Sequence, residues 1–542
     1  MDAMTPSRSA TAAGEDSHRS PGRLLIIAGI AAVLLGLLGR ILTYPLQHDE
    51  QFYLPPAVLL GDLHLYRDIG FTHMPNLPLL LSIFYGLTDQ YLLVGRLVVA
   101  TSWVALLTIL YRAGQAQNAG MLAIVTAAAL LLFNFNLLGE AGMAATNNFL
   151  PIPLAIGGIV LFLAATSDGA RAAPLAMASG LLLGLAAGFK ANFAPLVFPV
   201  GLAALMVPPA WPLWRRTSRL ALPLLAGGIV GGLPTLIYLF SDPPGFLSHV
   251  FEAHRGPQIG YWLANPDPLE QKVMGIGAKL LLGRELWFGG TALLMLALLL
   301  VLLLLLVEQA GGWRQMVRTA GWPVALVCAV ISVAALVSFL PTPAFPQYFT
   351  LPLPFGALLI LLLYGRLDEL RRKKSAPVFI ASLTLAAASG APSLVEGLLG
   401  FVQPSQWASS RLNADSSRLA QAVRTAGVSG PVATLEPLQA LSSGLPIYPE
   451  LALGPFTYRA ADWIPLEQRS HYRYLASPRS ITARLQAHRP AAVVIGREGV
   501  LDAPLERYAR QNGFRATILA SQSGDDPPVR TLFLAPAASN AP

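Results

Sequence analysis

The chain has 542 residues, of which 54% are hydrophobic and only 12% are charged, against roughly 45–50% and about 25% in typical soluble proteins. This composition excludes a disordered, collagen-like or ordinary soluble protein and indicates several membrane spans. A net charge of +8 could also indicate nucleic-acid binding, so the positions of the 37 Lys and Arg residues must decide between the two interpretations.

Eleven apolar stretches follow one another along the chain, each close to the length of about 20 residues that a helix needs to cross the hydrocarbon core. The first is expected to remain as an anchor, because no small-residue cleavage site follows it. The single cysteine, Cys328, lies in the ninth stretch and is expected to be a buried apolar residue. The predicted spans are 24–43, 91–111, 119–138, 148–166, 172–188, 191–208, 219–240, 287–307, 321–340, 346–364 and 376–398.

The basic residues orient these spans, since cytoplasmic segments carry an excess of Lys and Arg. With the N-terminus inside, fifteen of the 37 fall in inner segments, with at least one in every inner loop. An odd number of spans then places the C-terminus outside. Topology thus accounts for the positive charge, and no nucleic-acid partner is expected. We predict a multi-pass protein of the inner (cytoplasmic) membrane with a cytoplasmic N-terminus and a periplasmic or extracellular C-terminus.

The predicted fold is mostly α: a polytopic membrane helix bundle with a small α/β domain on the outer side. Residues 1–20 are predicted to be a disordered cytoplasmic N-terminus. Residues 21–398 form the transmembrane domain, whose large outer loops are 44–90 and 241–286. Residues 399–542 form the C-terminal exoplasmic domain. Because the inner loops are short, any chemistry is expected on the outer face.

Short apolar strands alternate with helical stretches in the C-terminal segment. This segment contains no GxGxxG motif, no P-loop and no metal-spaced set of His or Cys, so a binding or shielding role is expected. The predicted strands are Val432–Leu435, Ala491–Ile495, Ala516–Leu519 and Val529–Leu534, and the predicted helices are Arg411–Thr425 and Pro504–Asn512.

Two adjacent carboxylates, Asp49 and Glu50, follow the first span directly. Acidic groups at a membrane surface are costly and need compensation. A carboxylate at the mouth of a helix bundle suits a general base acting on a hydroxyl, or a ligand of a divalent cation. The alternative is that Asp49 caps a short interfacial helix that begins near Phe52.

The segments that follow the acidic pair resemble those of a known family. A stretch of apolar residues ending in Gly61 leads to Tyr66-Arg67-Asp68 and then to Thr72-His73-Met74-Pro75. This order resembles the first outer loop of type C glycosyltransferases that use polyprenyl-phosphate sugars, in particular the protein O-mannosyltransferase and aminoarabinose transferase group. The resemblance implies that Asp49 is the catalytic acid and Glu50 its partner.

Three later segments match the same family in the same order. They are Gly184–Pro195 with Lys190, Phe251–Arg255 with its His254 and Arg255 pair, and Pro346–Pro354 with Tyr348. A polyprenyl phosphate leaving group needs cationic donors around its oxygens, so Lys190, His254 and Arg255 are expected to bind the donor phosphate, together with Tyr348, Arg67 and His73.

Each of these residues also has a local interpretation. Lys190 could extend from a span end toward the interface, and Arg255 could pair with Glu252 one helical turn away. Arg67 could pair with Asp68, His254 could lie on a loop surface, and Tyr348 could be an interfacial aromatic.

The chain departs from the aminoarabinose transferases at the Pro-containing segment of the first loop. Where that branch has an acid and a Lys, this chain has Thr72 and His73. A second carboxylate ligand is therefore missing there, so the sequence does not decide whether Asp49 binds a divalent metal cation. His73 could be a phosphate contact or a metal ligand, or simply a polar residue of the loop. Glu140, in another outer loop, offers a substitute acid, whereas Asn147 and Asn148 are not assigned a catalytic role.

The resemblance implies transfer of a single hexosyl or pentosyl unit from a polyprenyl-phosphate donor to a lipid, glycan or protein acceptor, with inversion at the anomeric carbon. The expected partners are this donor, the acceptor and membrane lipids. A polymerase or ligase of polyprenyl-linked oligosaccharides is the first alternative. A lipid or solute transporter is the second, although transporters place ionisable residues near the bilayer midplane, whereas here they gather at the outer ends of the spans.

Overall fold

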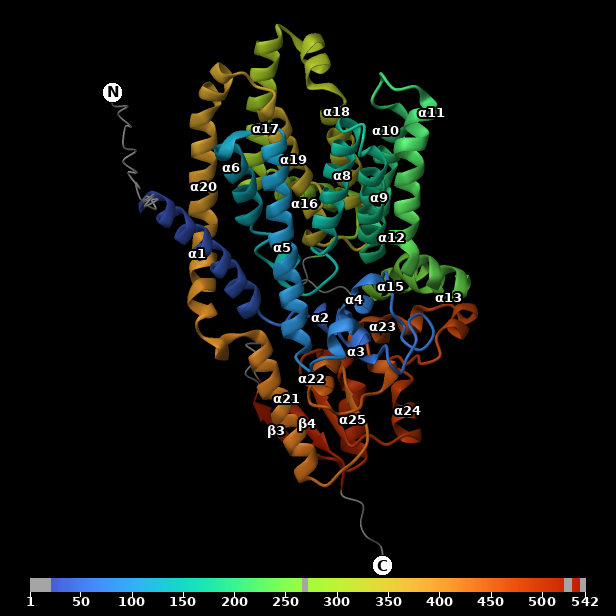
Figure 1. Cartoon of the computed structure of the whole chain (residues 1–542). Coiled ribbons are helices and arrows are strands. Elements are labelled where there is room, and N and C mark those ends of the chain that lie inside the picture. Colours follow the sequence, from blue (N-terminus) through green and yellow to red (C-terminus); the bar gives the residue numbers. More distant parts are fainter. Residues whose placement is uncertain (1–20, 266–271, 521–528, 537–542) are drawn as a thin grey trace, which may run out of the picture.

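The computed structural model describes residues 21–265, 272–520 and 529–536, and it has two parts (Figure 1). A bundle of long helices occupies one end, and a smaller domain around a β-sheet occupies the other. The short helices of the outer loops lie between them. The predicted disordered segment 1–20 lies outside the described residues.

Each predicted span coincides with a helix. Within the described residues, seven helices are long and apolar enough to cross a membrane, and five apolar helices are shorter. The chain is thus a multi-pass membrane protein, whereas the count of eleven crossings stays a prediction. The bundle helices are α1 (Pro21–Thr43), α5 (Tyr91–Ala116), α6 (Gly120–Leu132), α8 (Pro151–Ser167), α9 (Ala172–Phe189), α10 (Val197–Met206), α12 (Leu222–Ser241), α17 (Gly290–Ala310), α18 (Trp313–Ser338), α19 (Leu353–Gly365) and α20 (Glu369–Phe401).

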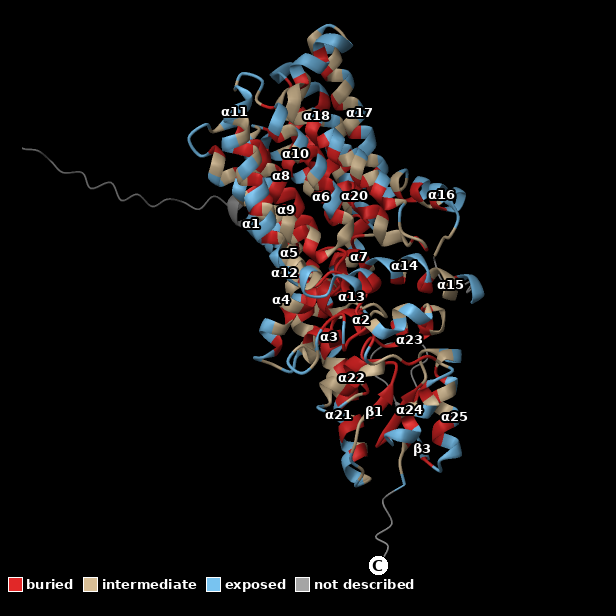
Figure 2. Cartoon of the chain, turned by 90° about the vertical axis from the view of Figure 1, so that its right-hand side faces the viewer, coloured by how far each residue is buried: buried red, intermediate tan, exposed pale blue. Residues whose placement is uncertain are grey.

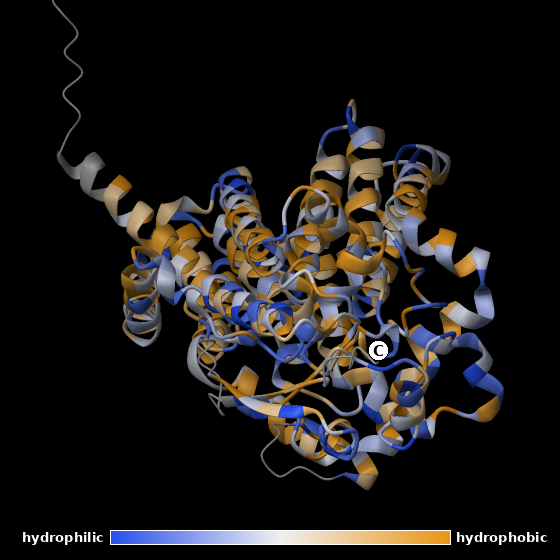
Figure 3. Ribbon diagram, turned by 90° about the horizontal axis from the view of Figure 1, so that it is seen from below, coloured by the Kyte–Doolittle hydropathy of each residue, from blue (hydrophilic) through white to orange (hydrophobic). Residues whose placement is uncertain are grey.

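The outward faces of the bundle are apolar, as expected where lipid is the solvent. Figure 3 shows hydrophobic residues throughout the bundle helices, and large side chains such as Leu300 and Leu304 of α17 are exposed. Helix α19 is instead buried almost throughout and forms the centre of the bundle. Cys328 of α18 is exposed, so the expectation that it is buried is wrong: it lies on the outward face of its helix.

Small residues let some helix backbones touch. A Cβ atom on Gly180 of α9 would lie 1.9 Å from the carbonyl oxygen of Leu224, and one on Gly227 of α12 would lie 1.9 Å from that of Met177. Close packing of this kind is a main source of helix association in membranes. It fixes α9, whose C-terminal end precedes Lys190.

The C-terminal domain is built on a four-stranded sheet with the order β1-β2-β4-β3. Strand β1 (Val432–Thr434) is parallel to β2 (Ala492–Ile495), and β4 (Val529–Leu534) is antiparallel to both β2 and β3 (Arg515–Ala520). The helices around the sheet are α21 (Ala408–Thr425), α22 (Pro437–Ser442), α23 (Pro455–Ala460), α24 (Ile481–Ala487) and α25 (Ala503–Gln511). The small α/β unit therefore agrees with the strands and helices predicted from the sequence.

The region between the two parts is built from short elements. Figure 2 shows buried residues both inside the bundle and in this junction, so the two parts are packed together. The short helices are α2 (Glu50–Tyr53), α3 (Pro55–Leu59), α4 (Asn76–Tyr85), α7 (Glu140–Met143), α13 (Pro243–Leu247), α14 (Ala253–Arg255), α15 (Pro257–Ala264) and α16 (Ile276–Trp287).

Candidate functional site

A cavity of about 610 Å³ lies at this junction, at the outer-loop end of the bundle. Its wall combines the first loop, the segments around Glu140 and Lys190, helices α14 and α15, the segment 340–348 and helix α23. Of the eight site residues predicted from the sequence, six line this cavity, and Glu50 and Arg67 do not; Glu140, which was considered as a substitute acid, also lines it. The six are Asp49, His73, Lys190, His254, Arg255 and Tyr348.

Two carboxyl groups meet on one side of the cavity. Asp49 occupies the N-cap position of α2, but its side chain makes no capping hydrogen bond, so the carboxylate faces the cavity. Glu140, at the start of α7, shares a side-chain hydrogen bond with Asp49. Burial raises the pKa of Glu140, and the neighbouring charge of Asp49 and their hydrogen bond raise it further. Glu140 thus keeps its proton at pH 7 and donates it to the hydrogen bond with Asp49.

Glu50 points away from the cavity into the protein. Its two oxygens accept hydrogen bonds from Arg96 at 2.7 and 2.6 Å, and also from the backbone amides of Ala145 and Gln47 at 2.8 Å each. Arg96, on α5, also donates to the carbonyl of Ile41 at the end of α1. Both side chains are almost completely inaccessible. This pair therefore joins α1, α5 and the first loop.

Lys190 approaches the carboxyl pair from another wall. It stands in an extended conformation between α9 and the following helical turn, with φ −151° and ψ 123°. Its Nζ donates a hydrogen bond to Asn148 Oδ1 and lies 4.7 Å from the centre of the Tyr348 ring. Burial lowers the pKa of Lys190 to about 8, and the charges of Asp49 and Glu140 act in the opposite direction. Lys190 thus lines the cavity, and its ammonium group also contacts Asn148 and the ring of Tyr348.

Two imidazoles form the next part of the wall. The rings of His73 and His254 meet edge to face with their centres 5.0 Å apart, and Nε2 of His254 donates to the carbonyl of Thr72 at 2.8 Å. Burial lowers the pKa of both histidines, and the nearby charge of Lys190 lowers it further. The two rings are therefore neutral at pH 7 and offer hydrogen bonds rather than charge.

Arg255 and Arg67 differ in what surrounds them. Arg255 lines the cavity, and within the described ranges it has no ion-pair partner, so the local pairing with Glu252 considered from the sequence is not formed. Arg67 instead donates to both oxygens of Asp68 at 3.2 and 3.0 Å, and 57% of its side chain is exposed. Although burial alone would raise the pKa of Asp68, this pairing lowers it to about 2. Arg67 therefore forms a local ion pair outside the cavity.

The cavity also contains residues that the sequence did not single out. Phe456 and Arg459 reach it from α23 of the C-terminal domain. The guanidinium carbon of Arg459 lies 4.4 Å from the centre of the Trp262 ring and 4.8 Å from that of Phe456. The contact between Arg459 and Trp262 joins residues about two hundred positions apart, which no local motif could reveal. A flat aromatic and cationic wall of this kind can stack against a sugar or contact an anion.

The same residues bear on a divalent metal. Asp49 and Glu140 offer two carboxyl groups, but these already share a proton. Within the part of the chain that the structure describes, no three or more His, Cys, Asp or Glu side chains are grouped as a metal site. The donor set therefore does not fit a tightly bound divalent cation, which usually takes six or more oxygen ligands, and we derive no step through one.

Comparison with known proteins shows the fold of the chain. No family model matches it, and no curated protein matches it. Among solved structures, ArnT from Cupriavidus metallidurans in the apo state is similar, with a TM-score of 0.59 and 14% identity over 94% of this chain and 97% of that one. ArnT from the same organism bound to undecaprenyl phosphate has a TM-score of 0.60 and 13% identity over 96% and 99% of the two chains. The chain thus has the type C glycosyltransferase fold, as its sequence motifs had indicated.

Proposed function

We propose that this membrane protein transfers one sugar from a polyprenyl-phosphate donor to an acceptor hydroxyl on the outer face of the cytoplasmic membrane. The observation that carries the proposal is the meeting of the Asp49 carboxyl group with Lys190 and Arg255 in a single cavity between the bundle and the C-terminal domain. The similar fold of ArnT bound to undecaprenyl phosphate supports a polyprenyl carrier. The acceptor is a lipid, a glycan or a protein.

Asp49 acts as the general base. It takes the proton of the acceptor hydroxyl while that oxygen attacks the anomeric carbon of the donor sugar. Glu140, which stays protonated beside it, donates a hydrogen bond that orients the Asp49 carboxylate. The acceptor oxygen attacks from the side opposite to the phosphate, and the bond between the anomeric carbon and the phosphate oxygen breaks. The configuration at the anomeric carbon therefore inverts. Polyprenyl phosphate leaves with the bonding electron pair.

Lys190 and Arg255 stabilise the charge that grows on the departing phosphate oxygen. The neutral His73 and His254 supply hydrogen bonds to the phosphate without adding charge. The ring of Tyr348 makes a cation–π contact with the ammonium group of Lys190. Glu50 has a positioning role: its buried pair with Arg96 holds the backbone that follows Asp49. Arg67 takes no part in this step, because its charge is paired with Asp68 outside the cavity.

The test uses the full-length protein in lipid nanodiscs with a panel of undecaprenyl-phosphate sugars, hexosyl and pentosyl, and with envelope lipids, glycans and proteins as acceptors. We expect one donor to release undecaprenyl phosphate and to yield a product that is one sugar heavier, with the inverted anomeric configuration. A ladder of products would instead identify a polymerase or ligase. Movement of the donor across sealed vesicles without a glycosidic product would identify a transporter.

A further inference from the structure

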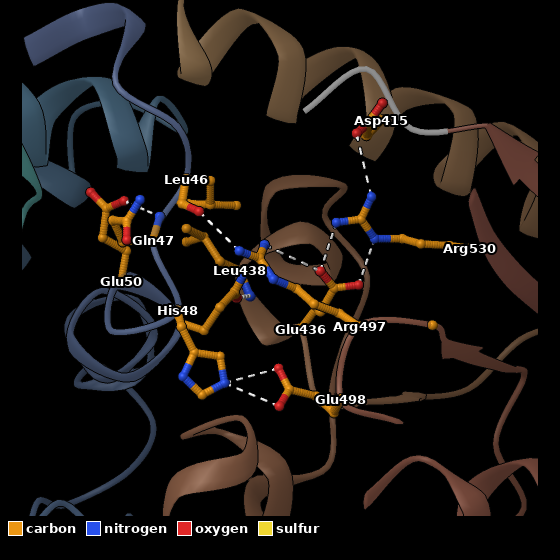
Figure 4. Close-up of polar contacts among 12 residues, drawn as sticks. Leu46, Gln47, His48, Glu50, Asp415, Glu436, Leu438, Arg497, Glu498 and Arg530 are labelled. Carbon is orange, nitrogen blue, oxygen red and sulfur yellow. Dashed lines mark hydrogen bonds and ion pairs between the residues drawn. The ribbon is translucent and has the colours of Figure 1, made fainter. Parts of the chain in front are cut away.

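The loop that carries Asp49 is held by the C-terminal domain on both sides of the acid (Figure 4). Three residues of this loop, close to Asp49 in the sequence, each bond to a different residue of that domain. Arg497 donates to the carbonyl of Leu46 at 2.9 Å, the amide of Leu438 donates to Gln51 Oε1 at 3.0 Å, and His48 Nε2 lies 3.0 Å from both oxygens of Glu498.

The contact of His48 with Glu498 is the one nearest to the acid, because His48 directly precedes Asp49. The carbonyl of His48 accepts a hydrogen bond from the amide of Gln51, and that of Asp49 accepts from Phe52 and Tyr53. His48 therefore lies in the turn that starts α2. Fixing its ring fixes the backbone from which the Asp49 carboxylate projects.

Glu498 is itself firmly placed. Its backbone amide donates to Asp502 Oδ2 at 3.0 Å, and the amide of Gly496 donates to the same oxygen at 2.9 Å. Its side chain is only 8% exposed and does not line the cavity. Glu498 therefore does not contact a substrate in the cavity, and its hydrogen bonds to His48, which does line the cavity, link it directly to the segment that carries Asp49.

The charge of Glu498 strengthens the contact. Burial would raise the pKa of this carboxyl group, but the charge and hydrogen bond of His48, together with Arg497 and Arg459, lower it overall. Glu498 is therefore ionised at pH 7 and accepts a charge-assisted hydrogen bond, which is about twice as strong as a neutral one. The His48 ring also packs against the ring of Phe456, with the two ring centres 4.8 Å apart.

We propose that Glu498 is a positioning residue for the transfer: through His48 it holds the Asp49 carboxylate where it can reach the acceptor hydroxyl. The C-terminal domain thus completes the site instead of only covering it. This inference rests on the proposed function, because the contact affects the rate only if Asp49 is the base of that reaction. A displacement of about 1 Å in such a group commonly costs about 100-fold in rate.

Loss of this contact leaves the two parts of the molecule docked. Thr457 Oγ1 donates to the carbonyl of Gly70 at 2.9 Å, and the amide of Arg473 donates to the carbonyl of Arg67 at the same distance. Arg473 also pairs with Asp68 at 3.3 Å. Substitution of Glu498 is therefore expected to affect the loop that carries Asp49, while these other contacts keep the C-terminal domain attached to the bundle.

The experiment compares Glu498→Ala and Glu498→Gln with the wild type, as full-length proteins in nanodiscs. The matched control is Glu450→Ala, because Glu450 is a similarly buried carboxylate, 5% exposed, that pairs with Arg484 inside the same domain at 2.6 Å. Two quantities are measured for each protein: kcat and KM for the donor, and the hydrogen exchange of the peptide that covers residues 44–53.

We expect Glu498→Ala to lower kcat at least tenfold with KM for the donor unchanged within twofold, and to speed exchange in 44–53. Glu498→Gln keeps an oxygen that accepts from His48, so it should recover most of kcat and serves as the second variant if Glu498→Ala folds poorly. Glu450→Ala should match the wild type in both measurements.

Unchanged exchange in 44–53, or a wild-type kcat together with faster exchange, would overturn the proposal. An equal loss in Glu450→Ala would also overturn it, since the effect would then be general to the domain. If the wild type releases no polyprenyl phosphate from any donor, the proposed function fails instead. The exchange measurement alone then decides whether Glu498 holds the loop.

Discussion

The carboxyl groups of Asp49 and Glu140 share a hydrogen bond in the wall of the cavity, although they come from two different loops. Two carboxylates at this distance cannot both be ionised without a large electrostatic cost. Burial and the neighbouring Asp49 raise the pKa of Glu140, so Glu140 keeps its proton and donates it to this hydrogen bond. Glu140 can therefore donate a hydrogen bond that orients the carboxyl group of Asp49.

Substitution of the base should abolish most of the transfer. Asp49→Asn keeps the size of the side chain but cannot take a proton, so kcat should fall by about 10²–10⁴-fold. The measurement is the release of undecaprenyl phosphate under saturating donor. Thermal unfolding of the purified variant provides the control, because the side chain makes no capping hydrogen bond that the fold would lose. A folded variant with the wild-type rate would remove Asp49 from this role.

The shared proton should also affect stability. Since the pKa of Glu140 is raised in the folded state, its contribution to stability is fully present below its ordinary value of about 4.3 and is lost as pH rises through the raised value. Glu140→Gln remains uncharged at every pH. We therefore expect the Tm advantage of the wild type over Glu140→Gln to shrink between about pH 5 and pH 8. A constant difference would contradict the raised pKa.

Lys190 should set an alkaline limit for donor binding. Its pKa of about 8 means that the ammonium form, which binds phosphate, is lost as pH rises through that value. The plot of kcat/KM for the donor against pH should fall there, because this ratio reports groups of the free enzyme.

Two variants identify the group responsible. Lys190→Arg keeps a charge that does not titrate in this range, so its profile should stay level past pH 8, at a lower absolute rate. Lys190→Ala should be slow at every pH. If the alkaline fall persists in Lys190→Ala and disappears in Glu140→Gln, it belongs to Glu140 instead.

The sequence indicated part of the cavity wall, because the predicted residues lie in short motifs near the ends of apolar spans. Asp49, Lys190 and His254 come together once those ends meet on one face of the bundle. Topology and local motifs therefore suffice to predict that these three residues share a site. The role of Glu50 was harder to predict, because its adjacency to Asp49 hides that the two side chains point in opposite directions. Its partner, Arg96, lies 46 residues later, within the apolar stretch 91–111, and no local motif joins the two.

The contribution of the C-terminal domain lay beyond sequence reasoning. Glu498 and Arg459 reach the first loop and the cavity from positions about four hundred residues after Asp49, and only the docking of the sheet domain brings them there. The strands themselves were predictable from their alternating apolar runs. The surface on which they would dock was not, because it is formed by short helices whose packing no periodicity encodes.

Removal of one member of the buried ion pair should destabilise the protein. Arg96→Met would leave the carboxylate of Glu50 buried without its partner, which typically costs about 3–5 kcal/mol. The free energy of unfolding, from denaturant titration in micelles, measures this loss. Adding Glu50→Gln should restore part of it, since the remaining side chain is then neutral. As a control, Glu369→Gln, which breaks an exposed pair with Lys373, should change little.

The contact of α9 with α12 should tolerate no side chain at its centre. Gly180→Ala would place a Cβ atom 1.9 Å from the carbonyl oxygen of Leu224, so the two helices must separate, at a typical cost of about 1–3 kcal/mol. Because Lys190 directly follows α9, its ammonium group would move away from Asp49, and kcat/KM should fall along with stability. Gly232→Ala, on the same α12, meets nothing within 4 Å and should leave both unchanged. Equal effects of the two substitutions would show that helix propensity, and not this close approach, governs the response.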